Sequence, residues 1–183
     1  MIIIPGSKNT IEDMKDLSDK GISEKIARAA KQGTVIFGIC GGFQILGAKI
    51  TDPYNIESNI EEIPGIGLLD IETVMSREKT TTQYTDKLSG TEGILAGGDG
   101  LEISGYEIHQ GISTGSGEII LGTPEDIKGA VRENIIGTYV HGIFDNGDFT
   151  GFLLNKIREM KGLDKVEEYF DFKEFKEQEY NKL

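Results

Sequence analysis

The sequence predicts an α/β fold with a doubly wound, mostly parallel sheet and antiparallel edge strands. The first half of the chain alternates short apolar runs, at residues 2–4 and 34–39, with helical stretches. Buried strands that alternate with helices are typical of a parallel sheet covered on both faces. The second half changes to short strand-like segments separated by glycine-rich turns, and this pattern favours antiparallel pairing.

The first half contains the signals for two helices between its strands. Thr10 opens the first helix, and Asp13 follows at the spacing of a capping box. Ser23 caps the second helix, which lies between breaks at Gly21 and Gly33. The second strand then leads into a short helical stretch, so this half of the chain has the order strand, helix, helix, strand, helix.

The second half contains six segments with the composition of strands. They cover residues 68–74, 80–85, 103–108, 118–121, 130–133 and 135–140. An amphipathic helix is predicted at 149–160, and Gly162 ends it. We therefore expect one domain over residues 1–162. Residues 163–183 are expected to be a helical tail of the same domain, cut short inside its last helix.

Length and composition limit the classes of function. The 183 residues fit one ordinary domain. The net charge of -12 argues against nucleic acid and anionic membrane surfaces as partners, because like charges repel. No apolar run approaches the roughly 20 residues that a membrane span needs. The single cysteine cannot form an internal disulfide, which predicts a cytoplasmic location and leaves one thiol free for chemistry.

The turn at Cys40 is the most informative segment. An apolar strand ends at a cysteine flanked by Gly38, Gly41 and Gly42, and a helix begins. This arrangement is typical of a nucleophile elbow, where small neighbours leave room for a substrate. The helix N-terminus favours a thiolate, and the Gly41 N–H is placed to bind an oxyanion. The alternative is a buried structural thiol.

Two histidines, His109 and His141, are candidates for the base that a thiol nucleophile needs. Each follows a predicted strand, and the carboxyl ends of parallel strands gather ligands at one edge of a sheet. Position alone favours His141 modestly. One cysteine and two distant histidines make a poor zinc set, so no metal site is expected.

Five motifs together resemble the cobyric acid synthase branch of the class I (triad) glutamine amidotransferases. They are PGSKNT at residues 5–10, GICGGFQ at 38–44, PGIGLL at 64–69, GYEIH at 105–109 and GTYVHGIFDN at 137–146. The resemblance implies a flavodoxin-like, class I amidotransferase fold. It also implies that Cys40 is the nucleophile and His141 its base, and it decides against His109 in that role.

The proposed chemistry suggests further site residues as hypotheses. Backbone N–H groups of Gly6 or Ser7 are expected to complete the oxyanion hole with Gly41. Gln44 and Tyr139 are candidate substrate contacts, although Gln44 fits equally well as a polar residue of the elbow helix and Tyr139 as a core aromatic residue.

The sequence departs from the wider superfamily at one position. Most triad members have a glutamate two residues after the catalytic histidine, whereas this chain has Ile143. The cobalamin branch is similar in lacking that glutamate. The group that orients the His141 ring is therefore open, with Asp145, Glu107 and a backbone carbonyl as candidates. His109 is expected to shape the pocket or the face toward a partner domain.

The resemblance also implies a reaction and partners. The expected substrate is L-glutamine, hydrolysed to supply ammonia for amidation of adenosylcobyrinic acid a,c-diamide to cobyric acid. The ATP-binding amidation domain of this branch is absent from the chain. ATP, Mg²⁺ and the corrinoid are expected to bind there, and no cofactor is expected in this domain. The alternatives are another cysteine hydrolase, such as a peptidase, the glutaminase of another ATP-dependent ligase, or a non-catalytic module.

Overall fold

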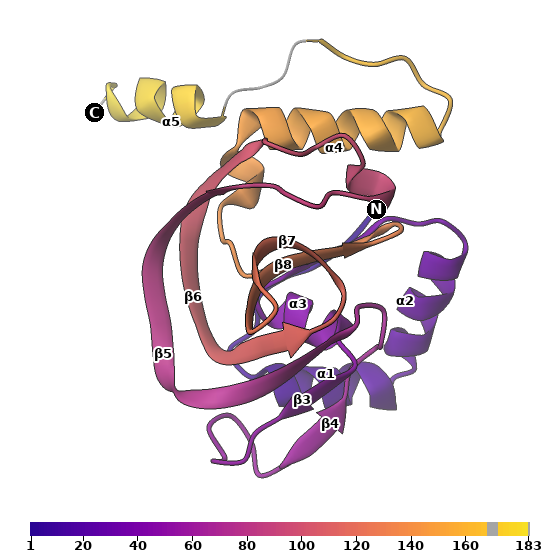
Figure 1. The fold of residues 1–183 in the computed structure, drawn as a ribbon, viewed down its shortest axis with the longest axis vertical. Coiled ribbons are helices and arrows are strands. Elements are labelled where there is room, and N and C mark those ends of the chain that lie inside the picture. Colours follow the sequence, from indigo (N-terminus) through magenta and orange to yellow (C-terminus); the bar gives the residue numbers. More distant parts are fainter. Residues whose placement is uncertain (168–171, 183) are drawn as a thin grey trace.

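The computed structural model describes residues 1–167 and 172–182 and confirms the α/β class (Figure 1). The first sheet has the strand order β1-β2-β9-β8-β7. Strands β1 (Ile2–Ile4), β2 (Ile36–Ile39) and β9 (Ile135–Thr138) are parallel. Strands β8 (Asp126–Arg132) and β7 (Glu118–Thr123) extend it with antiparallel pairing. The predicted antiparallel edge is therefore present.

Four further strands form a second sheet of order β4-β3-β5-β6, which the sequence pattern did not separate from the first. Its strands are β3 (Lys49–Thr51), β4 (Glu62–Pro64), β5 (Ile71–Lys87) and β6 (Glu102–Gly115). The β3–β5 pair is parallel, and the other two pairs are antiparallel. Antiparallel strands thus form a larger share of the fold than expected.

The predicted strands at 68–74 and 80–85 are wrong as separate elements, since residues 71–74 and 80–85 both belong to β5 and residues 68–70 precede it. The register of β5 against β6 shifts between Val74 and Lys79. Such an irregularity breaks the alternation of buried and exposed residues, so one long strand has the pattern of two. Strands β5 and β6 form a long curved ribbon that wraps around one side of the molecule (Figure 1).

Helices cover the sheets and begin close to the predicted positions. They are α1 (Thr10–Asp19), α2 (Ile22–Lys31), α3 (Gly41–Leu46), α4 (Gly147–Met160) and α5 (Phe172–Tyr180), with 3-10 turns η1 (Gly93–Leu95) and η2 (Ile143–Asp145). Among the described residues, no helix is both long and apolar enough to cross a bilayer.

The caps of α1 and α2 differ from the prediction. The Asn9 side chain, not Thr10, caps α1 by accepting from the Glu12 N–H at 3.2 Å. Asp13 instead accepts a hydrogen bond from the Ser7 hydroxyl. Gly21 is the N-cap of α2 in the left-handed conformation, in place of Ser23. Asparagine and glycine are favourable N-cap residues, as threonine and serine are. The sequence alone therefore does not show which of the neighbouring residues is the N-cap.

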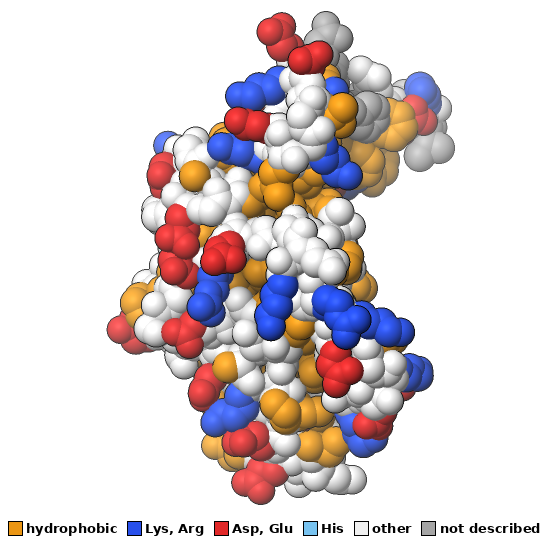
Figure 2. Space-filling view, turned by 90° about the vertical axis from the view of Figure 1, so that its right-hand side faces the viewer, with side chains coloured by type: hydrophobic (Ala, Val, Ile, Leu, Met, Phe, Trp, Pro, Cys, Tyr) orange, Lys and Arg blue, Asp and Glu red, His pale blue; other side chains and the backbone are white. Residues whose placement is uncertain are grey.

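The predicted tail is helical at 172–180, whereas residues 168–171 and 183 lie outside the described part of the chain. Its membership of the same domain stays a prediction. Acidic and basic side chains are interspersed over the face shown in Figure 2. Apolar side chains are also visible at its upper end, the end where α4 lies, and Leu154 and Met160 of that helix are exposed.

Apolar side chains pack against both faces of the first sheet. Successive residues of β2 face opposite sides: Phe37 packs with Phe149 and Leu153 of α4, whereas Ile36 packs with Phe43 of α3. This is the two-sided cover that the sequence predicted. Because β2 and β9 are adjacent and parallel, the segments that follow them emerge at the same edge of the sheet.

Candidate active site

Cys40 lies in a strained turn between β2 and α3. Its φ is 53° and its ψ is -112°, a conformation that residues with a side chain rarely adopt. Two backbone hydrogen bonds hold it: the Cys40 N–H donates to the Thr138 carbonyl at 2.8 Å, and the Gln44 N–H donates to the Cys40 carbonyl at 3.1 Å. This is the geometry of the nucleophile elbow that the sequence predicted.

The glycines around Cys40 allow the close packing of this turn. A Cβ on Gly42 would lie 2.1 Å from the Ile4 carbonyl oxygen, and one on Gly38 would lie 2.6 Å from the Gly42 oxygen. A Cβ on Gly41 would lie 2.8 Å from the Ser7 nitrogen. The loop after β1 therefore packs directly against the start of α3.

Gly6 in that loop brings together the two candidate catalytic residues. A Cβ built on Gly6 would lie 3.5 Å from Cys40 Cβ and 3.5 Å from His141 Cε1. The cysteine and the imidazole thus face the same space, from the ends of adjacent strands. The His109 ring instead contacts Glu107 and Tyr139.

The environment of Cys40 favours the neutral thiol. Burial raises the pKa of the thiol, and the Gly41 backbone N–H, which lowers the pKa, only partly offsets it. Glu57 raises the pKa further and Lys79 lowers it. The expected preference for a thiolate is therefore wrong for this conformation, because burial raises the pKa of the thiol by more than the Gly41 N–H lowers it. The sulfur lies 3.5 Å from the Ile108 carbonyl oxygen.

His141 is half-buried just beyond β9, and its pKa is also lowered. Burial is the largest cause and the charge of His109 adds to it, whereas a hydrogen bond to the Ile108 backbone opposes both. Its Nε2 atom is buried without a hydrogen-bond partner in the described structure. A neutral imidazole next to a neutral thiol is suited to general-base catalysis.

Gln44 and Tyr139, the candidate substrate contacts, have internal partners instead. Both side chains are buried. The Gln44 amide nitrogen donates to the Gln110 carbonyl at 2.9 Å and to the Tyr139 hydroxyl at 3.1 Å, while its oxygen accepts from the Thr10 hydroxyl at 3.1 Å. In this conformation the two side chains are packed inside the protein and are not accessible to a ligand.

Glu107 and His109 form a second buried layer. Glu107 Oε2 lies 3.1 Å from His109 Nε2 and 3.1 Å from Lys128 Nζ. The His109 ring stacks on Tyr139 with centroids 3.7 Å apart. Asp145 pairs with Lys176 at 2.9 Å. Neither acidic candidate forms an ion pair with His141 in the part of the chain that the structure describes.

The residues that do contact the His141 ring lie on β6, and sequence reasoning assigned them no role. The Tyr106 ring stacks on the imidazole, with centroids 5.1 Å apart and planes 7° apart. The Ile108 carbonyl interacts with both His141 and Cys40. Both residues belong to the GYEIH motif, which was the sequence signal that could have identified them. Only the fold, however, brings β6 next to His141.

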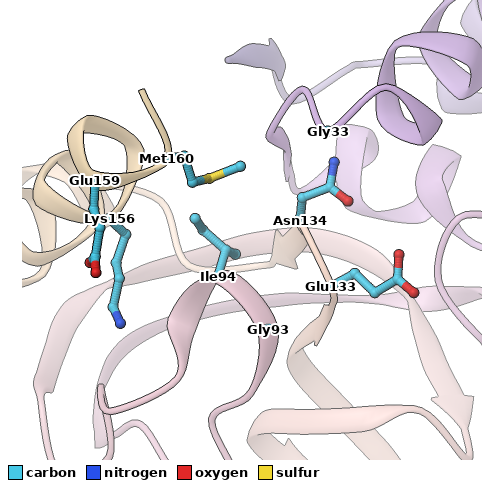
Figure 3. A pocket seen from close by; sticks show the side chains of 8 residues that line it. All are labelled: Gly33, Gly93, Ile94, Glu133, Asn134, Lys156, Glu159 and Met160. Atoms are coloured by element: carbon cyan, nitrogen blue, oxygen red, sulfur yellow. The ribbon is translucent and has the colours of Figure 1, made fainter. Parts of the chain in front are cut away.

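One cavity in the molecule, of about 590 Å³, lies away from Cys40. It is at the amino ends of β2 and β9, the opposite edge of the sheet, where α4 approaches η1 and the β8–β9 turn (Figure 3). Its lining residues are Gly33, Gly93, Ile94, Glu133, Asn134, Lys156, Glu159 and Met160. Among the described residues no cluster of His, Cys, Asp or Glu is suited to hold a metal ion.

Comparison with known proteins decides the family. The model of the CobB/CobQ-like glutamine amidotransferase domain matches residues 1–149. This chain belongs to that family. The match covers both candidate catalytic residues and the Gly6 loop that lies close to both of them.

Relatives of this amidotransferase domain are longer proteins. Cobyric acid synthases from Caldanaerobacter subterraneus and Clostridium novyi are 46% and 44% identical over the whole chain. That from Dehalococcoides mccartyi is 42% identical. The chain spans only 37–38% of the length of these relatives.

Solved structures confirm the amidotransferase fold. A glutamine amidotransferase structure superposes with a TM-score of 0.54 at 17% identity, and the match covers 88% of this chain and 78% of that one. PurLQS from Thermotoga maritima gives 0.53 at 20% identity, with 76% and 68% covered. At these identities the likeness shows the fold alone.

Proposed function

We propose that this chain is the glutaminase of a cobyric acid synthase, and that it hydrolyses L-glutamine to glutamate and ammonia through a thioester on Cys40. The observation that carries the proposal is the placement of Cys40, on a strained elbow, and His141 on either side of Gly6. Membership of the amidotransferase family supports the choice of an amide substrate.

The first half of the proposed reaction forms the thioester. His141, neutral in the free protein, accepts the thiol proton as the sulfur attacks the side-chain amide carbon of glutamine. The Gly41 N–H and an N–H of the Gly6–Ser7 loop stabilise the oxyanion. His141 then donates its proton to the leaving nitrogen, the carbon–nitrogen bond breaks and ammonia departs.

The second half releases glutamate. His141 is neutral again and takes a proton from water, which attacks the thioester carbon. The carbon–sulfur bond breaks, and the proton on His141 returns to the sulfur. Both half-reactions use the same base and the same oxyanion site, so no further residue is needed for the proton transfers.

The use of the ammonia is proposed from the relatives, because this chain spans only part of their length. In a cobyric acid synthase, an N-terminal ATP-binding domain uses ATP and Mg²⁺ to amidate adenosylcobyrinic acid a,c-diamide. We place this reaction in the cytoplasm, with L-glutamine as the substrate of the present domain and the corrinoid bound by the other.

Ammonia release from free glutamine tests the proposal. The protein, alone and with an N-terminal amidation domain from a relative, is expected to release ammonia, and Cys40→Ala is expected to abolish the release. The same protein with peptide substrates serves as the comparison. Cleavage of peptides without glutamine hydrolysis would identify a peptidase, and no turnover in either setting would identify a non-catalytic module.

A further inference from the structure

In the part of the chain that the structure describes, no carboxylate pairs with the His141 ring. The residue two positions after it, Ile143, is apolar and buried. Asp145 pairs with Lys176, and Glu107 pairs with His109 and Lys128. A base in a nucleophile–base pair needs a fixed ring orientation, since a misdirected imidazole does not reach the proton it must accept. Another group must therefore hold this ring.

Strand β6 holds the main chain of His141 through Tyr106. The His141 N–H donates to the Tyr106 carbonyl at 2.8 Å, and the Tyr106 N–H donates to the His141 carbonyl at 3.2 Å. This isolated antiparallel bridge joins β6 to His141, which lies beyond the end of β9. Gly105 permits it, because a Cβ there would lie 2.1 Å from the His141 carbonyl oxygen.

The same tyrosine also fixes the plane of the ring. Its aromatic face lies parallel to the imidazole, within 7°. The Ile108 backbone, two residues along the strand, also forms a hydrogen bond with His141 that raises the pKa of the imidazole. The stacked Tyr106 ring limits the tilt of the imidazole and so restricts the side-chain torsions of His141.

We propose that Tyr106 is a positioning residue for His141, and that its stacked ring performs the orienting function of the carboxylate that the triad lacks. Tyr106 is 43% exposed, so its side chain is not a buried core residue. An aromatic ring carries no formal negative charge, so it favours the protonated imidazole less than a carboxylate would. The catalytic part of this proposal rests on the proposed glutaminase function.

Two substitutions at Tyr106 separate stacking from the hydroxyl group. Tyr106→Phe keeps the ring and is expected to hold kcat within about threefold of the parent, whereas Tyr106→Leu is expected to lower kcat by roughly 10- to 100-fold, the scale of a misplaced catalytic group. KM is expected to change little, because the ring is not part of the reacting pair. Tyr180→Leu, at an exposed position in α5, is the matched control.

Alkylation of Cys40 with iodoacetamide gives a readout that does not need glutamine turnover. The chain has a single cysteine, so the label reports one site. At neutral pH the rate in Tyr106→Leu is expected to fall toward that of His141→Ala. At alkaline pH, where the thiolate forms without a base, the rates of both variants and of the parent are expected to converge.

The outcomes distinguish the two proposals. A parent protein that releases no ammonia, but in which Tyr106→Leu still slows alkylation at neutral pH, overturns the glutaminase function and keeps the positioning role. Tyr106→Leu with the kcat and alkylation rate of the parent overturns the positioning role. So does Tyr106→Phe with a loss equal to that of Tyr106→Leu, since the hydroxyl would then be the important group.

Discussion

The Cys40 turn and the His141 strand end hold the two candidate catalytic side chains by different means. The strained conformation of Cys40 is set within its own segment, through its positive φ and the glycines on both sides, although its N–H also donates to the distant Thr138 carbonyl. His141 is held by Tyr106 and Ile108, more than 30 residues earlier in the chain. A nucleophile can thus be built from one short segment, whereas the orientation of its base depends on a distant strand.

The largest expected loss of activity is at His141, and His109 provides the comparison. His141→Ala is expected to lower kcat by about 100-fold or more, the usual contribution of a general base. His109→Ala is expected to do less, because His109 contacts Tyr139 and Glu107 rather than Cys40. Steady-state ammonia release measures both, and equal losses would show that the roles are assigned wrongly.

Alanine at one closely packed glycine in each region, Gly42 and Gly105, tests whether both regions depend on close backbone packing. Gly42→Ala and Gly105→Ala are each expected to destabilise the fold by about 1–3 kcal/mol, because each Cβ would meet a carbonyl oxygen at 2.1 Å. Chemical denaturation measures the loss. Gly147→Ala, which has open space around its Cβ, is the control and is expected to leave stability unchanged.

The activity of the folded fraction of each glycine variant distinguishes the Cys40 turn from the His141 strand end. Gly105→Ala is expected to reduce kcat beyond its effect on stability, since the bridge to His141 would open. A Gly105→Ala protein with the parent kcat would break the comparison, because β6 would then not matter for the base.

Substitution of Glu107 tests the buried layer behind the site. Burial raises the pKa of this carboxyl, but hydrogen bonds from His109 and Lys128 outweigh it and the net pKa is lowered. Glu107→Gln is therefore expected to cost about 1–3 kcal/mol at neutral pH. The contribution of a carboxyl with a lowered folded-state pKa is present above its ordinary value of 4.5 and is lost as pH falls through the folded-state value.

Denaturation at neutral and acidic pH measures the Glu107 effect. The difference between the parent and Glu107→Gln is expected to shrink below pH 4.5. Glu102→Gln, on the exposed side of the same strand, is the matched control. A difference that stays constant with pH would show that shape, and not charge, makes Glu107 important.

The smallest expected effect is in the pH profile of the parent protein. Because the pKa of His141 is lowered, the acid limb of kcat/KM is expected below 6.5, its ordinary value. Because the pKa of Cys40 is raised, alkylation without substrate is expected to have its midpoint above 9.0. An alkylation midpoint below neutral pH would show a resting thiolate–imidazolium pair instead.

The sequence by itself determined the α/β class, the elbow at Cys40 and the candidacy of His141. Each depends on residues close together in the chain: an apolar run, a cysteine among glycines, a histidine after a strand. Local hydrophobic period and backbone sterics act over a few residues, so they are visible without a fold.

Only the packing of the chain establishes the second sheet, the burial that shifts the pKa values of Cys40 and His141, and the contacts of the imidazole. The pairing of β3, β4, β5 and β6, the burial of the Cys40 thiol and the stacking of Tyr106 on His141 all depend on segments that are far apart in sequence. Such contacts and the desolvation they cause arise only when the chain packs, because no local pattern encodes which distant strand will cover a given side chain.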